Sequence, residues 1–293
     1  MVEAVKRGAS DYLTKPFADQ ELELAIESAL EKQTLRDEIK VLQRRLEQDG
    51  DSPDLVLSSP RMVRIRELAL QVADTDAPVL ILGESGVGKE VLARFIHARS
   101  GRCPKRFVKV NCAALPQDLL ESELFGYERG AFSGAVRDKP GKFELADKGS
   151  ILLDEISEMS PHLQAKLLHV LQDGEFSRLG GSVTVRVDAR VLSSTNVQLE
   201  ATVASGCFRE DLYFRLNVIR IEIPPLRERP EDIAVLSRHF FDLYSERYRS
   251  GTDTLPPPLL EAFERHALPG AAEQGGGNVE GVQSRCPRAA ADP

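Results

Sequence analysis

The sequence of 293 residues has only four cysteines and five histidines, and no two cysteines form a CxxC pair. Structural zinc sites need closely spaced ligand pairs, so the sequence argues against a site of that kind. It also lacks an apolar run of the roughly 20 residues that a membrane-spanning helix requires. Because its N-terminus has no apolar signal core either, we expect a cytoplasmic protein.

An excess of basic residues is absent too, since the formal net charge is −8. Proteins that coat nucleic acids neutralise phosphates with clustered lysine and arginine, so the overall charge argues against that class. The length suits one large domain with appendages, or about two domains.

What the chain does contain is a phosphate-binding loop with the spacing GxxxxGK. The apolar run Val79–Leu82 predicts a buried parallel strand, and the segment after Lys89 predicts a helix. Glycines allow backbone N–H groups to turn toward phosphate oxygens, and a helix N-terminus adds positive potential. We expect Lys89 to reach the β- and γ-phosphates of a nucleotide. The residues expected to hold the nucleotide are Gly83, Glu84, Ser85, Gly86, Val87, Gly88, Lys89 and Glu90.

Glu90 stands where such loops usually carry serine or threonine. A carboxylate can bind Mg²⁺, but it also repels phosphate, so the residues alone leave its role open.

A second chemical signal follows the apolar run Ile151–Leu153, which ends in Asp154 and Glu155. Open α/β sheets bind ligands at the carboxyl ends of their strands, where these two carboxylates are expected. One carboxylate can hold Mg²⁺, and its neighbour can orient or deprotonate an attacking water. We assign the metal to Asp154 and the water to Glu155.

Between residues 54 and 226, apolar segments alternate with helical patterns, which predicts a parallel sheet covered by helices. The expected strands are Val79–Leu82, Phe107–Val110, Ser150–Leu153, Val191–Ser194 and Val218–Ile221. Residues 227–270 contain only helical patterns and predict a small helical lid. One face of that lid is expected to carry Ile233, Leu236, Phe240 and Leu243.

The two ends of the chain differ from this middle. Residues 34–53 predict either a short coiled coil, through Leu35, Ile39, Leu42 and Leu46, or a solvated linker helix. Residues 271–293 contain no leucine, isoleucine or phenylalanine and are expected to be disordered. Residues 1–33 resemble the last strand and helix of a response-regulator receiver domain; an amphipathic leader helix is the alternative.

Further segments carry a more specific resemblance. Residues 121–128 read ESELFGYE and are followed by GAFSGA, residues 130–135; residues 107–112 read FVKVNC; residues 194–196 read STN; residues 208–217 read FREDLYFRLN. With the phosphate loop and its GKE ending, these segments resemble the AAA+ ATPase domain of NtrC-like activators of sigma-54 RNA polymerase. The resemblance extends from about Ser58 to Gly270.

This resemblance implies an α/β AAA+ fold with a parallel sheet and a helical lid, ATP and Mg²⁺ as cofactors, and self-association into a ring, expected to be a hexamer. It implies that Asn111 holds Glu155 in an inactive pose and that Asn196 is the sensor I residue. It also implies that Arg209 and Arg215 reach the ATP of a neighbouring subunit, where guanidinium groups stabilise phosphoryl charge. Without the resemblance, surface ion pairs with Glu210 and Asp211 would explain both arginines.

The same resemblance implies that the hexapeptide binds sigma-54. Its residues are Gly130, Ala131, Phe132, Ser133, Gly134 and Ala135. An aromatic on a protruding loop supplies contact area at low entropic cost. Ser133 replaces the threonine of the family, and a surface turn with Phe132 tucked inward is the alternative.

Beyond Gly270 the chain departs from the family pattern. The family continues Asn-Val-Arg-Glu-Leu after Pro-Gly, whereas here Asn278-Val279 is followed by Glu280, so no sensor II arginine can be assigned. A shifted reading frame is our hypothesis. The family's helix-turn-helix domain is missing as well, so direct DNA binding is not expected.

The leading functional hypothesis is an ATPase that remodels the closed promoter complex of sigma-54 polymerase. The alternatives are a nucleotide-binding regulatory module with little turnover and a P-loop ATPase that acts on another protein.

Overall fold

The computed structural model describes residues 55–248 and residue 263. The predictions for residues 1–33, 34–53 and 271–293 lie outside these residues, as does most of what was predicted for the second half of the lid. Each helix in the described part is too short or too polar to cross a lipid bilayer.

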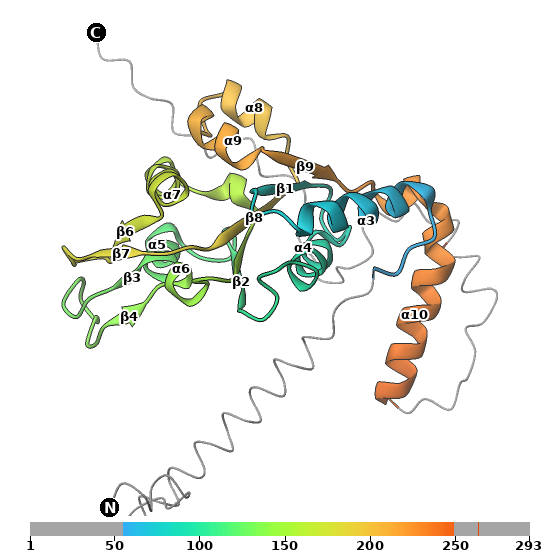
Figure 1. Cartoon of the computed structure of the whole chain (residues 1–293), viewed down its shortest axis with the longest axis horizontal. Coiled ribbons are helices and arrows are strands. Elements are labelled where there is room, and N and C mark those ends of the chain that lie inside the picture. Colours follow the sequence, from blue (N-terminus) through green and yellow to red (C-terminus); the bar gives the residue numbers. More distant parts are fainter. Residues whose placement is uncertain (1–54, 249–262, 264–293) are drawn as a thin grey trace, which may run out of the picture. The chain divides into compact units, whose positions relative to one another are not determined.

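A five-stranded parallel sheet forms the centre of the described part, with the strand order β2-β5-β8-β1-β9 (Figure 1). Its strands are β1 (Val79–Leu82), β2 (Phe107–Asn111), β5 (Ser150–Asp154), β8 (Arg190–Thr195) and β9 (Ile219–Glu222). All five predicted strands are present, and their bounds differ from the prediction by no more than one residue at either end. The α/β prediction is therefore confirmed.

The three inner strands β5, β8 and β1 supply side chains to two hydrophobic cores, one on each face of the sheet, because side chains alternate along a strand. In β1, Val79 and Ile81 belong to one core, and Leu80 and Leu82 belong to the other. All four are buried, which explains why the sequence shows an unbroken apolar run here.

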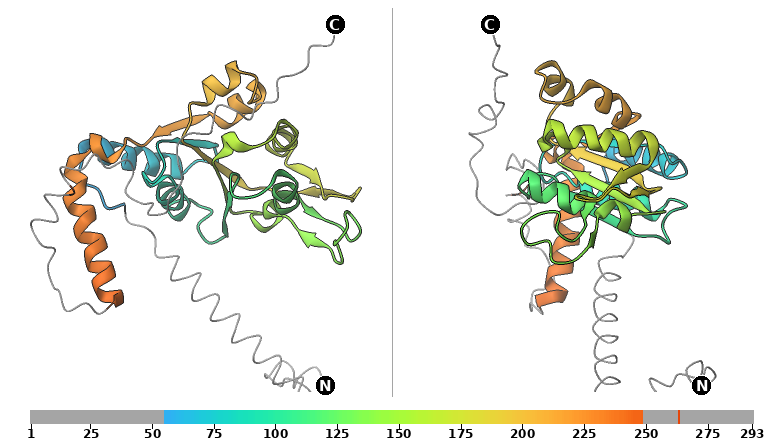
Figure 2. Two further views of the ribbon diagram at one scale, coloured as in Figure 1. Left: turned by 180° about the vertical axis from the view of Figure 1, so that it is seen from behind. Right: turned by 90° about the vertical axis from the view of Figure 1, so that its left-hand side faces the viewer.

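Helices lie on both sides of the sheet (Figure 2). The first core includes side chains of α3 (Pro60–Ala73) and α4 (Lys89–Ala98). The second includes side chains of α5 (Gln117–Phe125), α6 (Lys142–Leu145), α7 (Pro161–Asp173), α8 (Leu199–Ala204) and α9 (Glu210–Leu216).

The ends of α7 are well specified by the sequence. The hydroxyl of Ser160 accepts a hydrogen bond from the Leu163 N–H, and Pro161 occupies the first helical position. Gly174 follows the last helical residue. The buried face of this helix carries leucines and also Gln164, whose side chain is 0% exposed. A polar residue in that position needs hydrogen-bond partners, which are described below.

Two short hairpins extend from the second core. They are formed by β3 (Gly126–Tyr127) with β4 (Lys139–Pro140), and by β6 (Glu175–Ser177) with β7 (Thr184–Arg186). Leu179 joins them, because its N–H donates to the Gly126 carbonyl at 3.0 Å and its carbonyl accepts from the Glu128 N–H at 3.0 Å. A Cβ on Gly180 would lie 2.7 Å from the Ala131 Cβ, so only glycine lets the two loops approach this closely.

After β9 the chain forms the 3₁₀ turn η2 (Leu226–Glu228) and the helix α10 (Pro230–Tyr248). Ile233 is buried, whereas Phe240 and Leu243 are 39% and 49% exposed. Within the described part, the apolar face predicted for this helix is therefore buried only near its start.

Candidate functional site

The predicted phosphate loop joins β1 to α4 at the carboxyl end of the sheet. Gly83 has φ 153°, and a Cβ at this position would lie 2.8 Å from the Ile223 carbonyl oxygen and 2.9 Å from Val87 Cγ2. The close turn therefore depends on glycine. Because α4 begins at Lys89, its unpaired N–H groups lie beside the loop. This combination is suited to an anion such as phosphate.

Lys89 is folded into the loop and is 7% exposed. Its Nζ donates to the carbonyl oxygens of Gly83 at 3.0 Å and Glu84 at 3.2 Å, and lies 3.4 Å from Glu155 Oε1. One ammonium group thus connects the phosphate loop after β1 with the acid pair after β5.

The two acids at the end of β5 have different environments. Asp154 accepts a hydrogen bond from the Ser194 hydroxyl at 2.6 Å, and its Oδ2 lies 3.6 Å from Lys109 Nζ. Glu155 accepts from the Asn196 backbone N–H at 3.2 Å through Oε2, while Oε1 faces Lys89. Asp154 is therefore fixed within the sheet edge, and Glu155 lies in the charged space above the loop.

Glu155 also has an unusual backbone, with φ 53° and ψ 54°. A residue other than glycine in this left-handed region costs on the order of 1 kcal/mol or more, and such strain is concentrated at functional sites. Only one other non-glycine residue in the described part, Lys148, has a positive φ.

Glu90 makes two strong contacts that fix its carboxylate. Oε1 accepts from Arg94 Nε and Nη2 at 3.0 and 2.9 Å, and Oε2 accepts from Lys109 Nζ at 2.6 Å. Burial opposes ionisation of this carboxyl, but the hydrogen bonds from Lys109 and Arg94 outweigh burial and hold its pKa below the ordinary value. The negative charge that would repel phosphate is thereby balanced.

Lys109 was not assigned from the sequence. It comes from β2 and lies between Glu90 and Asp154, so it joins the phosphate loop to the acid pair by a second route. The sequence signal for this role of Lys109 was a lysine within the predicted strand Phe107–Val110.

Asn111 ends β2 opposite Asp154 in the strand register. Its side-chain oxygen accepts hydrogen bonds from the N–H groups of Ala113 at 2.9 Å and Ala114 at 3.2 Å. The hydrogen bonds of the described residues include none between Asn111 and Glu155, so the inactive pose implied by the resemblance stays a prediction.

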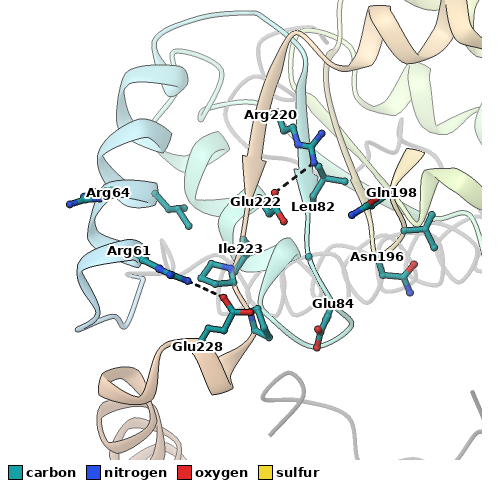
Figure 3. A pocket seen from close by; sticks show the side chains of 15 residues that line it. Arg61, Arg64, Leu82, Glu84, Asn196, Gln198, Arg220, Glu222, Ile223 and Glu228 are labelled. Carbon is teal, nitrogen blue, oxygen red and sulfur yellow. Dashed lines mark hydrogen bonds and ion pairs between the residues drawn. The ribbon is translucent and has the colours of Figure 1, made fainter. Parts of the chain in front are cut away.

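A hollow of about 520 Å³ lies beside the phosphate loop (Figure 3). It is lined from the carboxyl ends of β1, β8 and β9 and from α3, and Figure 3 shows Asn196, Glu84 and Arg61 around it. The exposed Asn196 side chain belongs to this lining, while its backbone N–H serves Glu155. The position predicted as sensor I is therefore adjacent to both the loop and the acids.

Two arginines near η2 contact the phosphate loop and were not assigned from the sequence. Arg227 pairs with Glu84 through two hydrogen bonds of 2.7 and 2.5 Å. Arg229 is buried and donates from Nη2 to the Val87 carbonyl at 2.9 Å. The segment that leads into α10 is thus attached to the loop at two points.

Arg209 and Arg215 lie away from this cluster. Arg209 precedes α9 and pairs with Asp211 at 2.6 Å, as the simpler interpretation of the sequence expected. Arg215 donates from Nε and Nη2 to the Leu171 carbonyl on α7. It also lines a second hollow together with Pro78 and Asp188, which precede β1 and β8. Arg215 is therefore at the opposite end of these strands from the phosphate loop.

The hexapeptide 130–135 forms the loop between β3 and β4 and is organised by its own hydrogen bonds. The Ala135 N–H donates to the Phe132 carbonyl, and the Gly130 N–H donates to the Ala135 carbonyl. Phe132 is 43% exposed and packs edge-on against Tyr127, with ring centroids 4.9 Å apart. The aromatic ring lies between the exposed and the tucked positions considered above, and the neighbouring Val136 is 81% exposed.

The described residues contain no group of three or more His, Cys, Asp or Glu side chains that could hold a metal alone. Mg²⁺ in phosphate sites is held by one or two carboxylates together with phosphate oxygens and water. Asp154, beside an anion-binding loop, fits that mode.

Residues 55–222 match a protein-family model described as the Sigma-54 interaction domain. The chain is 46% identical over 269 residues to the regulatory protein AtoC of Escherichia coli, which covers 92% of this chain and 58% of AtoC. It is 42% identical over 273 residues to the DNA-binding transcriptional regulator NtrC of Salmonella typhimurium, with coverages of 93% and 57%. The chain thus spans a little over half the length of these relatives.

Solved structures of NtrX from Brucella abortus are similar as well. The complex with ADP has a TM-score of 0.70 and 39% sequence identity, and covers 92% of this chain and 59% of that chain. The complex with ATP has the same TM-score and 38% identity, with coverages of 92% and 57%.

Proposed function

The chain belongs to the Sigma-54 interaction domain family, whose members are NtrC-like activators with an AAA+ domain, and from this premise we propose that it binds and hydrolyses ATP to remodel the closed promoter complex of sigma-54 RNA polymerase. The ADP and ATP complexes of NtrX support adenine nucleotide as the ligand. The family match favours turnover over the alternative of a nucleotide-binding module.

The observation that carries the proposal is the position of Lys89 between the phosphate loop and Glu155. A lysine held at 3.0 Å by a loop carbonyl and 3.4 Å from a carboxylate is placed where a triphosphate would meet both elements. Lys89 and the N–H groups at the start of α4 then bind the phosphates.

The two acids, Asp154 and Glu155, have different roles. Asp154 is held by Ser194 and would be the ligand for Mg²⁺, which when bound would neutralise developing phosphoryl charge. Glu155 orients the attacking water and accepts its proton, and Asn196 keeps the Glu155 carboxylate in position through its N–H. Glu90 is occupied by Lys109 and Arg94, so we assign it a supporting role in the loop.

Arg209 and Arg215 act in a neighbouring copy's site. Arg215 lies at the opposite end of β1 and β8 from its own phosphate loop, which supports action between copies. A finger arginine can contribute about 10³–10⁵ in rate, so the isolated chain is expected to be slow. Assembly into a ring, a hexamer by resemblance, brings each arginine to the next site.

The loop of residues 130–135 binds sigma-54. Its support is the half-exposed Phe132 beside the exposed Val136. Packing of Ala131 against Gly180 fixes the base of the loop on the second hairpin. A half-exposed aromatic ring of this kind offers contact area to a protein partner.

The test is ATP hydrolysis by the purified chain, measured across protein concentration with and without sigma-54 factor. We expect specific activity to rise with protein concentration as copies assemble. We also expect Phe132→Ala to lose sigma-54 binding while retaining basal hydrolysis. A specific activity that stays constant while the chain passes from monomer to assembly would contradict action between copies.

A further inference from the structure

Gln164 occupies a position in α7 that the functional assignment above does not use. Its side chain is fully buried and makes three hydrogen bonds to backbone groups. Nε2 donates to the Met159 carbonyl at 2.8 Å and to the Cys207 carbonyl at 3.0 Å, and Oε1 accepts from the Arg209 N–H at 2.8 Å.

These bonds use both N–H donors of the amide and its carbonyl oxygen. A buried polar group left without a partner costs about 1–3 kcal/mol, so each bonded backbone group is held firmly. Leu163 and Leu167 fill the core on the same helix, which leaves the amide little freedom to rotate.

One end of this connection is the acid turn. Glu155 starts the 3₁₀ turn η1 (Ile156–Glu158). The Glu158 N–H donates to the Glu155 carbonyl at 3.1 Å, and the Met159 N–H donates to the Ile156 carbonyl at 3.3 Å. Only one hydrogen-bonded turn therefore separates Met159 from Glu155, whose backbone has a strained φ.

The other end is the arginine segment. The Arg209 N–H is bonded to Gln164, and Arg209 is the N-cap residue of α9, because the Tyr213 N–H donates to its carbonyl at 3.0 Å. Its guanidinium is at the surface, paired with Asp211. The backbone of Arg209 is thus fixed, whereas its side chain is free to exchange partners.

We propose that Gln164 is a positioning residue that couples the Glu155 turn of one copy to the Arg209 that the same copy presents to its neighbour. The proposal rests on the proposed function, since it requires Arg209 to act between copies. When Glu155 and its turn change with the state of the nucleotide site, Gln164 moves the Arg209 backbone with Met159, and adjacent sites are thereby linked.

Gln117, whose side chain is exposed, provides a second glutamine control at the same turn. It is also a glutamine that holds the acid turn, since Nε2 donates to the Glu158 carbonyl at 2.9 Å and Oε1 accepts from the Ser160 N–H at 3.0 Å. It comes from α5 and makes no hydrogen bond to the arginine segment among the bonds of the described residues. Gln117→Met therefore loosens the turn without releasing Arg209.

The experiment is hydrolysis by mixtures of full-length variants. At an ATP concentration well below its Kd, Lys89→Ala protein supplies intact arginines but a nearly empty site. Arg209→Ala protein supplies an intact site but no Arg209. Their mixture is expected to recover activity. If it stays inactive, action between copies fails, and both the proposed function of Arg209 and the coupling by Gln164 are overturned.

Gln164→Met conserves side-chain volume and is expected to lower hydrolysis about 10-fold to 100-fold, because small misplacements of a catalytic group are costly. Its ATP binding is expected to stay within about 2-fold, which also verifies folding. Activity is expected to recover when Gln164→Met protein is mixed with Lys89→Ala protein, and to stay low when it is mixed with Arg209→Ala protein.

The opposite pattern, recovery only with Arg209→Ala protein, would place the defect in the variant's own site and overturn the proposal. The same conclusion follows if Gln117→Met fails to supply Arg209→Ala protein with a working arginine, because that would make any loosening of the turn sufficient. If Gln164→Met does not fold, Gln164→Asn takes its place, since the shorter amide stays neutral and polar but cannot reach all three backbone partners.

Discussion

The two ends of the central sheet carry similar clusters of charge with opposite properties. At the carboxyl end, Lys89 and Lys109 face carboxylates beside a hollow and a strained backbone. At the amino end, Arg102 is 16% exposed and makes hydrogen bonds to Asp76 at 2.7 Å and to the side chain and carbonyl of Asp188 at 2.8 Å. Both clusters lie beside a hollow, but only the first has a strained backbone and the unpaired N–H groups of a helix start. Charge beside a hollow therefore does not identify a site, whereas an anion-binding loop beside paired acids does.

The largest expected effect is a loss of ATP hydrolysis without a loss of ATP binding, caused by a substitution at the carboxyl end of the sheet. Glu155→Gln removes the proton acceptor but keeps the hydrogen-bonding shape, so turnover is expected to fall about 10²–10⁴-fold while ATP affinity is retained. Steady-state hydrolysis and equilibrium nucleotide binding measure the two quantities. Unchanged turnover in this variant would remove Glu155 from its assigned role.

Next in size is the loss of the loop lysine. Lys89→Ala removes charge-assisted bonds to phosphate, each of which contributes about 1.5–3 kcal/mol, so ATP affinity is expected to fall about 10-fold to 100-fold. Titration with a fluorescent ATP analogue gives the affinity, and a thermal melt without nucleotide is the control. ATP binding equal to that of the unmodified chain would contradict the assignment of the phosphate loop.

Removal of Lys109 tests whether its charge balances Glu90. Lys109→Met leaves Glu90 with Arg94 alone, and the excess negative charge beside the triphosphate is expected to weaken ATP binding by about 10-fold. Adding Glu90→Gln to this variant removes the repulsion and is expected to restore most of the affinity. A double variant that binds as weakly as the single one would show that Lys109 acts in another way.

At the amino end of the sheet we expect the reverse. A substitution there lowers the free energy of unfolding and leaves ATP binding and hydrolysis unchanged. Arg102→Ala is expected to cost about 1 kcal/mol, the upper range for partly exposed ion pairs, and to lower Tm by about 2–4 °C. The matched control is Arg186→Ala, which breaks one exposed pair with Glu175 and is expected to change stability by less than about 0.5 kcal/mol. A loss of ATP affinity in Arg102→Ala would contradict the distinction between the two ends of the sheet.

The smallest effect concerns pH. Hydrogen bonds from Arg102 hold the pKa values of Asp76 and Asp188 below their ordinary values. The stability they contribute is present above the ordinary carboxyl pKa of about 4 and is lost as pH falls through the lowered values. Melts between pH 3 and 6 are therefore expected to show a shallower acid slope in Arg102→Ala than in the unmodified chain. Parallel slopes would indicate that other carboxyls dominate.

Much of the sheet could be predicted because buried parallel strands leave unbroken apolar runs, as in β1 and β5. The phosphate loop and the acid pair were equally visible, since each depends on adjacent residues at fixed spacing. The partners that Lys109, Arg227 and Arg229 meet could not be predicted, because their contacts join segments far apart in sequence. Gln164 left a partial signal, a polar residue on the apolar face of α7, but its three backbone partners depend on the packing of α9.

The left-handed backbone at Glu155 lowers the stability of the fold, while the side chain of the same residue supplies the carboxylate that the proposed hydrolysis requires. Glycine would adopt that conformation without steric penalty, so Glu155→Gly would relieve local strain even as it removes the carboxylate. A laboratory selection that rewarded heat resistance alone would favour such a change and would lose the proposed proton acceptor. In the proposed function, the strained backbone places the Glu155 carboxylate beside Lys89, where glycine would leave no proton acceptor.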